Sequence, residues 1–192
     1  VYRDSYSIFA GSTLPVKKLG WSDMYTSMGI TGVTMGLTGE AAVNPETPAV
    51  MLPFAMCKEM AHRMSIDDEN DARFAAFLAG SNNPDPAFQY SAYLMAYMYC
   101  YDALASIPTS TAKAAANETA AGLTQNMRSD LRQYTKFFGE RKVRANLKTI
   151  VSEPGTPDTE PDSFTAITFS EYSDVSDLLT SWYIQHFITP LH

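Results

Sequence analysis

Apolar residues recur at helical spacing along most of the chain. The pattern between Pro48 and Met64 predicts a helix that has its proline near the first turn. A second helix is expected to begin among the acids at 67–69 and to end at Gly80, because carboxylates favour helix N-termini and glycine favours C-termini. Further helices are predicted over residues 87–106, 122–148 (with a break near Gly139) and 173–187, and a weak helix or a connection over 108–121.

The first 45 residues have a different pattern, rich in turn formers and β-branched residues. Glycines divide the segment from Gly29 to Glu40 into short extended pieces, and their spacing fits neither a phosphate loop nor a dinucleotide-binding turn. The sequence therefore predicts a mainly α protein of the α+β class with a small N-terminal β element. We expect a single domain over 1–192, with a β- and loop-rich lobe at 1–45 and a helical part at 46–192.

Composition and charge narrow the classes of function. The 192 residues are 45% hydrophobic, enough for a core, and carry 14 Lys and Arg against 21 Asp and Glu, a net charge of −7. A pI near 4.9 argues against non-specific nucleic-acid binding, so no nucleic-acid partner is expected. The longest apolar runs fall short of the roughly 20 residues that cross a bilayer. The chain begins at Val1 rather than Met, so we expect that a native N-terminal segment has been removed.

The charges are segregated along the second half of the chain. Residues 128–148 are basic, and residues 153–177 carry acids and no base. The simpler interpretation is two solvated faces that partly pair with each other. The alternative is a membrane-surface module, in which Arg128, Arg132 and Lys136 face anionic lipid head groups.

The segment that carries chemistry is Lys58-Glu59-Met60-Ala61-His62, followed by Glu69. In a zincin helix, two histidines four residues apart bind Zn²⁺, and the glutamate after the first one is the general base. Glu59 and His62 have that spacing. The first ligand position is Lys58, whose ammonium has no lone pair for a cation.

This degenerate motif and its surroundings resemble domain-of-unknown-function family 3810, bacterial membrane-anchored proteins similar to zinc metallopeptidases of the gluzincin type. The resemblance covers most of the chain, and its other elements are Gly29-Ile30-Thr31-Gly32, Thr38-Gly39-Glu40-Ala41, Leu52-Pro53-Phe54, Asp71-Ala72, Phe74-Ala75-Ala76-Phe77-Leu78-Ala79, Tyr90-Ser91, Tyr172-Ser173-Asp174-Val175 and Leu178-Leu179.

The resemblance implies a zincin-like fold on the extracytoplasmic side of a membrane, behind an N-terminal anchor. It implies that Glu59 is the vestigial general base and that His62 and Glu69 are vestigial zinc ligands. The segment 32–40 would lie beside the cleft, where zincins hold peptide as an added strand. Three positions depart from the family pattern: Lys58 replaces the first histidine, Ser65 a glycine, and Asp71 a glutamate.

Three roles for Lys58 stay open at this point. The ammonium could replace the metal among Glu59 and Glu69, it could extend to water from an ordinary helix, or a residual metal site could remain. Zinc, the cofactor implied by the resemblance, is expected to be absent.

The leading hypothesis is a pseudoenzyme: a degenerate metallopeptidase-like domain that binds or scaffolds a peptide or protein partner. The alternatives are an active zinc peptidase with an atypical metal site and the membrane-surface module. Cys57 and Cys100 allow one bridge or two free thiols, and no serine or cysteine lies in a recognisable nucleophile motif.

Overall fold

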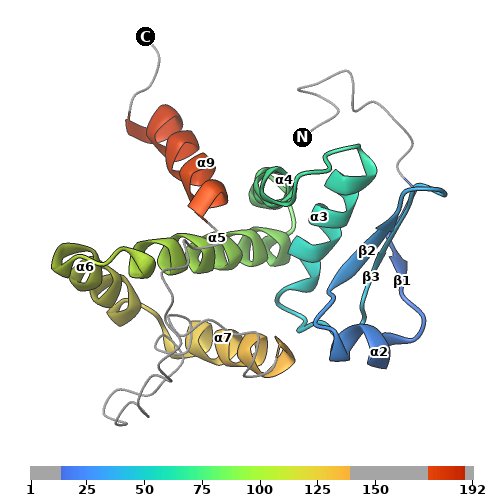
Figure 1. Ribbon diagram of the computed structural model, residues 1–192, viewed down its shortest axis with the longest axis horizontal. Coiled ribbons are helices and arrows are strands. Elements are labelled where there is room, and N and C mark those ends of the chain that lie inside the picture. The colour runs from blue at the N-terminus through green and yellow to red at the C-terminus, as the bar shows by residue number, and fades with distance from the viewer. Residues whose placement is uncertain (1–13, 139–172, 189–192) are drawn as a thin grey trace. The chain divides into compact units, whose positions relative to one another are not determined.

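The computed structural model describes residues 14–138 and 173–188 (Figure 1). The described chain is mostly helical, with a small three-stranded sheet near its N-terminal end, which confirms the predicted fold class. Within the described ranges, no helix combines the length and apolar character needed to cross a membrane. The chain divides into two compact units, residues 1–96 and 97–192, and each is described by itself.

The sheet of the first unit contains β1 (Lys17–Lys18), β2 (Gly32–Met35) and β3 (Glu40–Val43) in the order β1-β3-β2. Strand β3 is central: it pairs parallel with β1 and antiparallel with β2. The β2–β3 hairpin confirms the extended pieces expected between Gly29 and Glu40. The short helix α2 (Ser22–Ser27) was not predicted; it follows Trp21, which adopts a left-handed φ of 60° that the sequence pattern does not signal.

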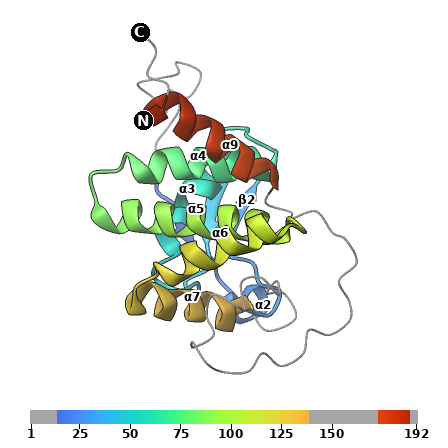
Figure 2. The same ribbon diagram turned by 90° about the vertical axis from the view of Figure 1, so that its left-hand side faces the viewer.

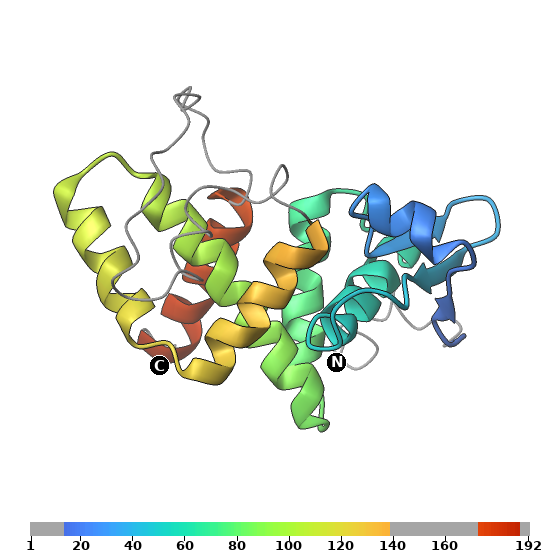
Figure 3. The same cartoon turned by 90° about the horizontal axis from the view of Figure 1, so that it is seen from below.

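Helix α3 (Leu52–Arg63) lies against the sheet and carries the motif (Figures 1 and 3). Its start is four residues later than Pro48, where the sequence predicted it, because residues 48–51 form a turn in which the Met51 amide donates to the Pro48 carbonyl at 2.8 Å. Pro53 lies in the first helical turn, where its missing N–H costs nothing. The amide of Phe54 donates to the hydroxyl of Ser91 at 3.1 Å. Phe54 lies in the first turn of the helix, where a backbone amide has no carbonyl partner within the helix, so Ser91 supplies the acceptor.

Helix α4 (Glu69–Ser81) begins where the acidic cluster predicted it. Asp68 is the N-cap, and its carboxylate accepts the amides of Asn70 and Asp71 at 2.8 and 3.0 Å. The connection from α3 includes Ser65 at φ 66°, a left-handed conformation that favours glycine. This short turn brings the end of α3 and the start of α4 together, and α3 and α4 pack closely through alanines.

Helix α5 (Pro86–Ser106) crosses the boundary between the two units. Its first part completes the core of the first unit. A Cβ atom at Gly80 would lie 2.8 Å from the Cβ of Ala92, so glycine permits the close approach of α4 and α5. The rings of Phe77 and Tyr93 meet edge to face with centroids 5.6 Å apart.

The second unit contains the end of α5, α6 (Ser110–Ala121), α7 (Gln125–Phe138), α9 (Ser173–Tyr183) and a π-helical turn, Ile184–Ile188. Residues 108–121, left open between a weak helix and a connection, form α6, which Thr109 caps and which a short turn joins to α7 (Figure 2). The predicted helix over 122–148 is observed as α7. Gly139 and the basic residues after it lie outside the described residues, as does most of the acidic stretch at 153–177.

Candidate functional site

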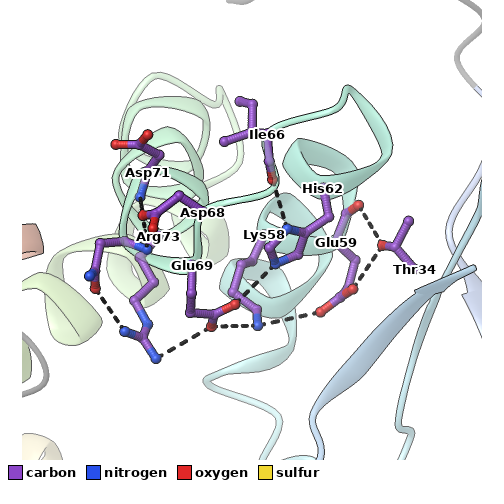
Figure 4. A network of polar contacts seen from close by, with 10 residues as sticks. Thr34, Lys58, Glu59, His62, Ile66, Asp68, Glu69, Asp71 and Arg73 are labelled. Atoms are coloured by element: carbon purple, nitrogen blue, oxygen red, sulfur yellow. Dashed lines mark hydrogen bonds and ion pairs between the residues drawn. The ribbon is translucent and has the colours of Figure 1, made fainter. Parts of the chain in front are cut away.

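Side chains from three elements of the first unit form one row of polar contacts (Figure 4). The row runs from Arg73 and Glu69 on α4, through Lys58 and Glu59 on α3, to Thr34 on β2. We refer to these five residues together with His62 as the charged row. Lys58 and His62 lie one turn apart on the helix face that meets Glu69, whereas Glu59 is directed at β2 and is reached by the long side chain of Lys58.

Glu59 is buried in the interface between α3 and the sheet, with an exposed fraction of 2%. The Thr34 hydroxyl donates to its carboxylate Oε2 at 2.9 Å and also lies 3.0 Å from its main-chain carbonyl. A Cβ atom at Gly32 would lie 2.5 Å from the Glu59 Cγ, so strand β2 can pass over this side chain only with glycine there. The carboxylate is therefore held against β2.

Lys58 supplies the cation that Glu59 needs. Its Nζ lies 2.9 Å from Oε1 of Glu69 and 3.6 Å from Oε1 of Glu59. The side chain is 16% exposed, so the ammonium lies among the carboxylates and does not extend freely into water. Leaving the buried carboxylate of Glu59 without a cationic partner would lower the stability of the fold by about 3 kcal/mol.

His62 is fixed through both ring nitrogens. Nδ1 lies 2.8 Å from the carbonyl of Ile66, and Nε2 lies 3.1 Å from Oε2 of Glu69. Because a carbonyl oxygen only accepts, Nδ1 is the donor in the first contact. Zinc-binding histidines are oriented by the same kind of bond from the ring nitrogen that does not bind the metal. In this chain the other nitrogen is directed at Glu69.

Glu69 is the carboxylate at which the cations converge. Oε1 also lies 3.3 Å from Nη2 of Arg73, whose Nη1 donates to the side chain of Asn70 at 2.9 Å. Partial burial alone would raise the pKa of Glu69, but the ammonium of Lys58, with Arg73 and His62, outweighs burial and holds that pKa below its ordinary value. Glu69 is therefore an anion near neutral pH.

The structure thus brings four of the five predicted site residues together: Lys58, Glu59, His62 and Glu69. Asp71 does not join them; it is exposed at the start of α4 and its carboxylate points away from the row (Figure 4). The reason is helical geometry, because Glu69 and Asp71 are two positions apart and lie on different faces.

The sequence analysis expected the segment 32–40 beside the site but gave no individual role to Gly32 or Thr34, and it missed Arg73. Arg73 follows Glu69 at the i,i+4 spacing of a helical ion pair, a signal that was available. The pairing of β2 with Glu59 joins positions 25 residues apart and has no local signal.

The residues present do not fit a zinc site. Within the described residues, no three His, Cys, Asp or Glu side chains are placed to hold a metal ion. Glu59 is engaged by Thr34 and Lys58, which leaves His62 and Glu69 as donors, and these two contact each other. A cation at position 58 would also repel a divalent metal.

The two cysteines are both free thiols. Burial raises the pKa of Cys57 and that of Cys100 to about 11, so neither is a thiolate nucleophile near neutral pH. Of the three basic residues expected on a membrane-facing helix, Arg128 donates to the Ala120 carbonyl, Arg132 is half-buried and Lys136 is exposed. Membrane-surface binding stays a prediction.

Residues 1–152 match the family described as "Protein of unknown function (DUF3810)". Neither the curated proteins nor the solved structures include a match to this chain.

Proposed function

The chain belongs to the family of proteins of unknown function DUF3810, and we propose that it is a metallopeptidase-like domain that carries a lysine in place of the metal and binds a peptide or protein partner without cleaving it. In this proposal the motif helix is retained for its architecture. The zincin-like fold, the membrane anchor and the extracytoplasmic location implied by the family resemblance belong to the same proposal.

One observation carries the proposal: the ammonium of Lys58 lies between two carboxylates of the degenerate motif, at 2.9 Å from Glu69 and 3.6 Å from Glu59. Together, Lys58 and Arg73 place two positive charges beside Glu59 and Glu69, the same charge that a divalent ion would supply. Metal-dependent activation of water then has no place in the site, because the fixed ammonium offers no open coordination position.

Strand β2 is the element on which a partner would bind. It is one of the two edge strands of the described sheet, and Thr34 fixes it beside the motif helix. An edge strand presents main-chain donors and acceptors to which an extended peptide can add as a further strand. Near the turn that follows β2, Met35 is 49% exposed and Leu37 is fully exposed, so apolar side chains of a partner would find contacts.

The first test is the metal content of the purified chain. We expect elemental mass spectrometry to find no stoichiometric zinc after exposure to zinc and desalting. Near-stoichiometric zinc would contradict the proposal and favour the second candidate, an active zinc peptidase with an atypical site.

The second test restores the ligand with Lys58→His. If His62 and Glu69 retain the geometry of a metal site, this variant gains tight zinc binding, and Lys113→His, a change of an exposed helical lysine, does not. Circular dichroism before and after metal addition checks that both variants fold. A folded Lys58→His variant that binds no zinc would rule out an ancestral metal site at these positions.

A further inference from the structure

Three cationic or proton-donating side chains converge on the single carboxylate of Glu69. Oε1 lies 2.9 Å from Lys58 Nζ and 3.3 Å from Arg73 Nη2, and Oε2 lies 3.1 Å from His62 Nε2. The three donors come from two helices and approach both oxygens, as Figure 4 shows. We refer to Lys58, His62 and Arg73 as the donor cradle.

The donors are more buried than the carboxylate that they hold. The side chains of Lys58 and Arg73 are 16% exposed and that of His62 is 19% exposed, whereas that of Glu69 is 44% exposed. A half-exposed glutamate at the first position of a helix can rotate into water, while packing keeps the cradle in place. Glu69 is therefore the exchangeable member of the cluster.

The second carboxylate of the row cannot take its place. Glu59 is 2% exposed, and Thr34 and Gly32 hold it against β2. If Glu69 rotates away, Lys58 and Arg73 each lose one carboxylate partner and Nε2 of His62 loses its contact with Oε2 of Glu69. Lys58 keeps Glu59 and Arg73 keeps Asn70 as partners, but two cations then face a single buried carboxylate. This excess of positive charge favours the binding of an anion from solution.

The shape of that anion follows from the group now in the cradle. Two coplanar oxygens on one carbon receive donors from two sides, and a second carboxylate reproduces this arrangement. The edge of β2 lies near the same row, so a peptide placed along β2 would bring its own carboxylate within reach of Lys58.

From this geometry we propose that the donor cradle is a carboxylate-binding site, that Glu69 is its built-in competitor, and that a partner peptide displaces Glu69 with a carboxylate of its own. The ligand group is a C-terminal carboxylate or the side chain of an Asp or Glu. The inference deepens the proposed function and rests on it, because the cation at position 58 must be the ammonium and not a metal.

The decisive variant is Glu69→Gln, which removes the competing charge and keeps the shape of the side chain. The probe is sodium acetate, titrated at constant ionic strength with sodium chloride. The chain has three histidines, so ¹³C-labelled histidine gives three ring signals; that of His62 reports the cradle, and those of His186 and His192 are internal controls.

We expect Glu69→Gln to bind acetate about tenfold more tightly than the wild type, because charged donors gain an ionised acceptor. The control Glu118→Gln, a change of an exposed helical glutamate, leaves the affinity at the wild-type value. Adding Lys58→Met or Arg73→Met to Glu69→Gln removes the gain. If Glu69→Gln binds acetate no better than Glu118→Gln, or if both double variants keep the gain, the proposal is wrong.

A second arm separates the two sources of carboxylate. Acetylated peptides are compared with a free C-terminus, with an amidated C-terminus, and with an amidated C-terminus and one internal Glu. Binding of the first or the third, with displacement of the His62 signal, supports the proposal and identifies the source. If all three bind equally, or none moves the His62 signal, the proposal is overturned.

These outcomes are independent of the test of the proposed function. Zinc in the wild-type chain would contradict the proposed function by elemental analysis alone. A metal-free chain that binds peptide without moving the His62 signal would leave the proposed function intact and remove only the carboxylate site. If Glu69→Gln does not fold, the peptide titration of the wild type decides.

Discussion

The hydroxyl of Thr34 on β2 lies within hydrogen-bonding distance of two oxygens of Glu59, the main-chain carbonyl at 3.0 Å and the carboxylate at 2.9 Å. One side chain of this edge strand is therefore bonded both to the backbone of the motif helix and to its buried carboxylate. Glu59 is a structural link between strand and helix.

Removing that hydroxyl should destabilise the fold. For Thr34→Val, which keeps the shape of the side chain, we expect a loss of about 1–3 kcal/mol in the free energy of unfolding, because a buried carboxylate loses a donor. Urea denaturation followed by circular dichroism measures the loss. Thr111→Val, on the exposed face of α6, is the matched control and should change little. Equal stabilities of the two variants would contradict the structural role of the Thr34 hydroxyl.

The glycines of β2 and its turn offer a matched pair. Gly32→Ala places a Cβ atom 2.5 Å from Cγ and 2.7 Å from Oε1 of Glu59, and we expect it to cost about 1–3 kcal/mol in stability. Gly36→Ala meets nothing within 4 Å and should be neutral or slightly stabilising. Thermal unfolding of the two variants side by side tests this, and a Gly32→Ala variant as stable as Gly36→Ala would show that β2 does not press on Glu59.

Replacing the lysine by a neutral residue should be more damaging than removing both charges. Lys58→Met leaves the buried Glu59 without its cation, and we expect a loss of about 3 kcal/mol. The double variant Lys58→Met with Glu59→Gln should recover a large part of that loss. Lys113→Met is the exposed-lysine control. A double variant that is less stable than the sum of the single changes would argue against charge compensation.

The pH dependence of stability should contain a contribution from Glu69. Its pKa is lower in the folded chain than in the unfolded chain, so the unfolded chain binds the proton more readily. The stabilisation is present above the ordinary value of 4.5 and is lost as the pH falls below it. Relative to Glu118→Gln, Glu69→Gln should therefore show a shallower loss of stability on acidification, measured from urea midpoints. If the stability of both variants falls equally with decreasing pH, Glu69 makes no such contribution.

The turn between α3 and α4 carries strain that glycine would relieve. Ser65 has φ 66°, and L-residues pay for this conformation, whereas glycine adopts it freely. After allowance for the greater freedom of glycine in the unfolded chain, Ser65→Gly should stabilise by about 0.5–1 kcal/mol. Ser65→Ala, which keeps the strain, is the control in a thermal melt. A destabilised Ser65→Gly variant would mean that the serine side chain contributes a contact.

Local patterns predicted much of this fold and four of the six residues of the charged row. The spacing of the apolar residues and the acids at 67–69 placed the helices, because helix periodicity and capping depend on neighbouring residues. The same spacing brought Lys58 and His62 together on one face. The start of α3 was predicted too early, since Pro48 and Pro53 both fit a first turn and only packing decides between them. The contacts of Gly32 and Thr34 with Glu59 join residues that are far apart in the sequence, so no pattern of neighbouring residues predicts them.

Gly32 and Glu59 also limit how this sequence can diverge. Because strand β2 lies directly over the buried side chain of Glu59, any side chain at position 32 needs a shorter residue at position 59, and neither position can change first without a loss of stability. The two positions should therefore vary as a pair among descendants of this chain. A larger residue at position 32 is expected only together with a shorter residue at position 59.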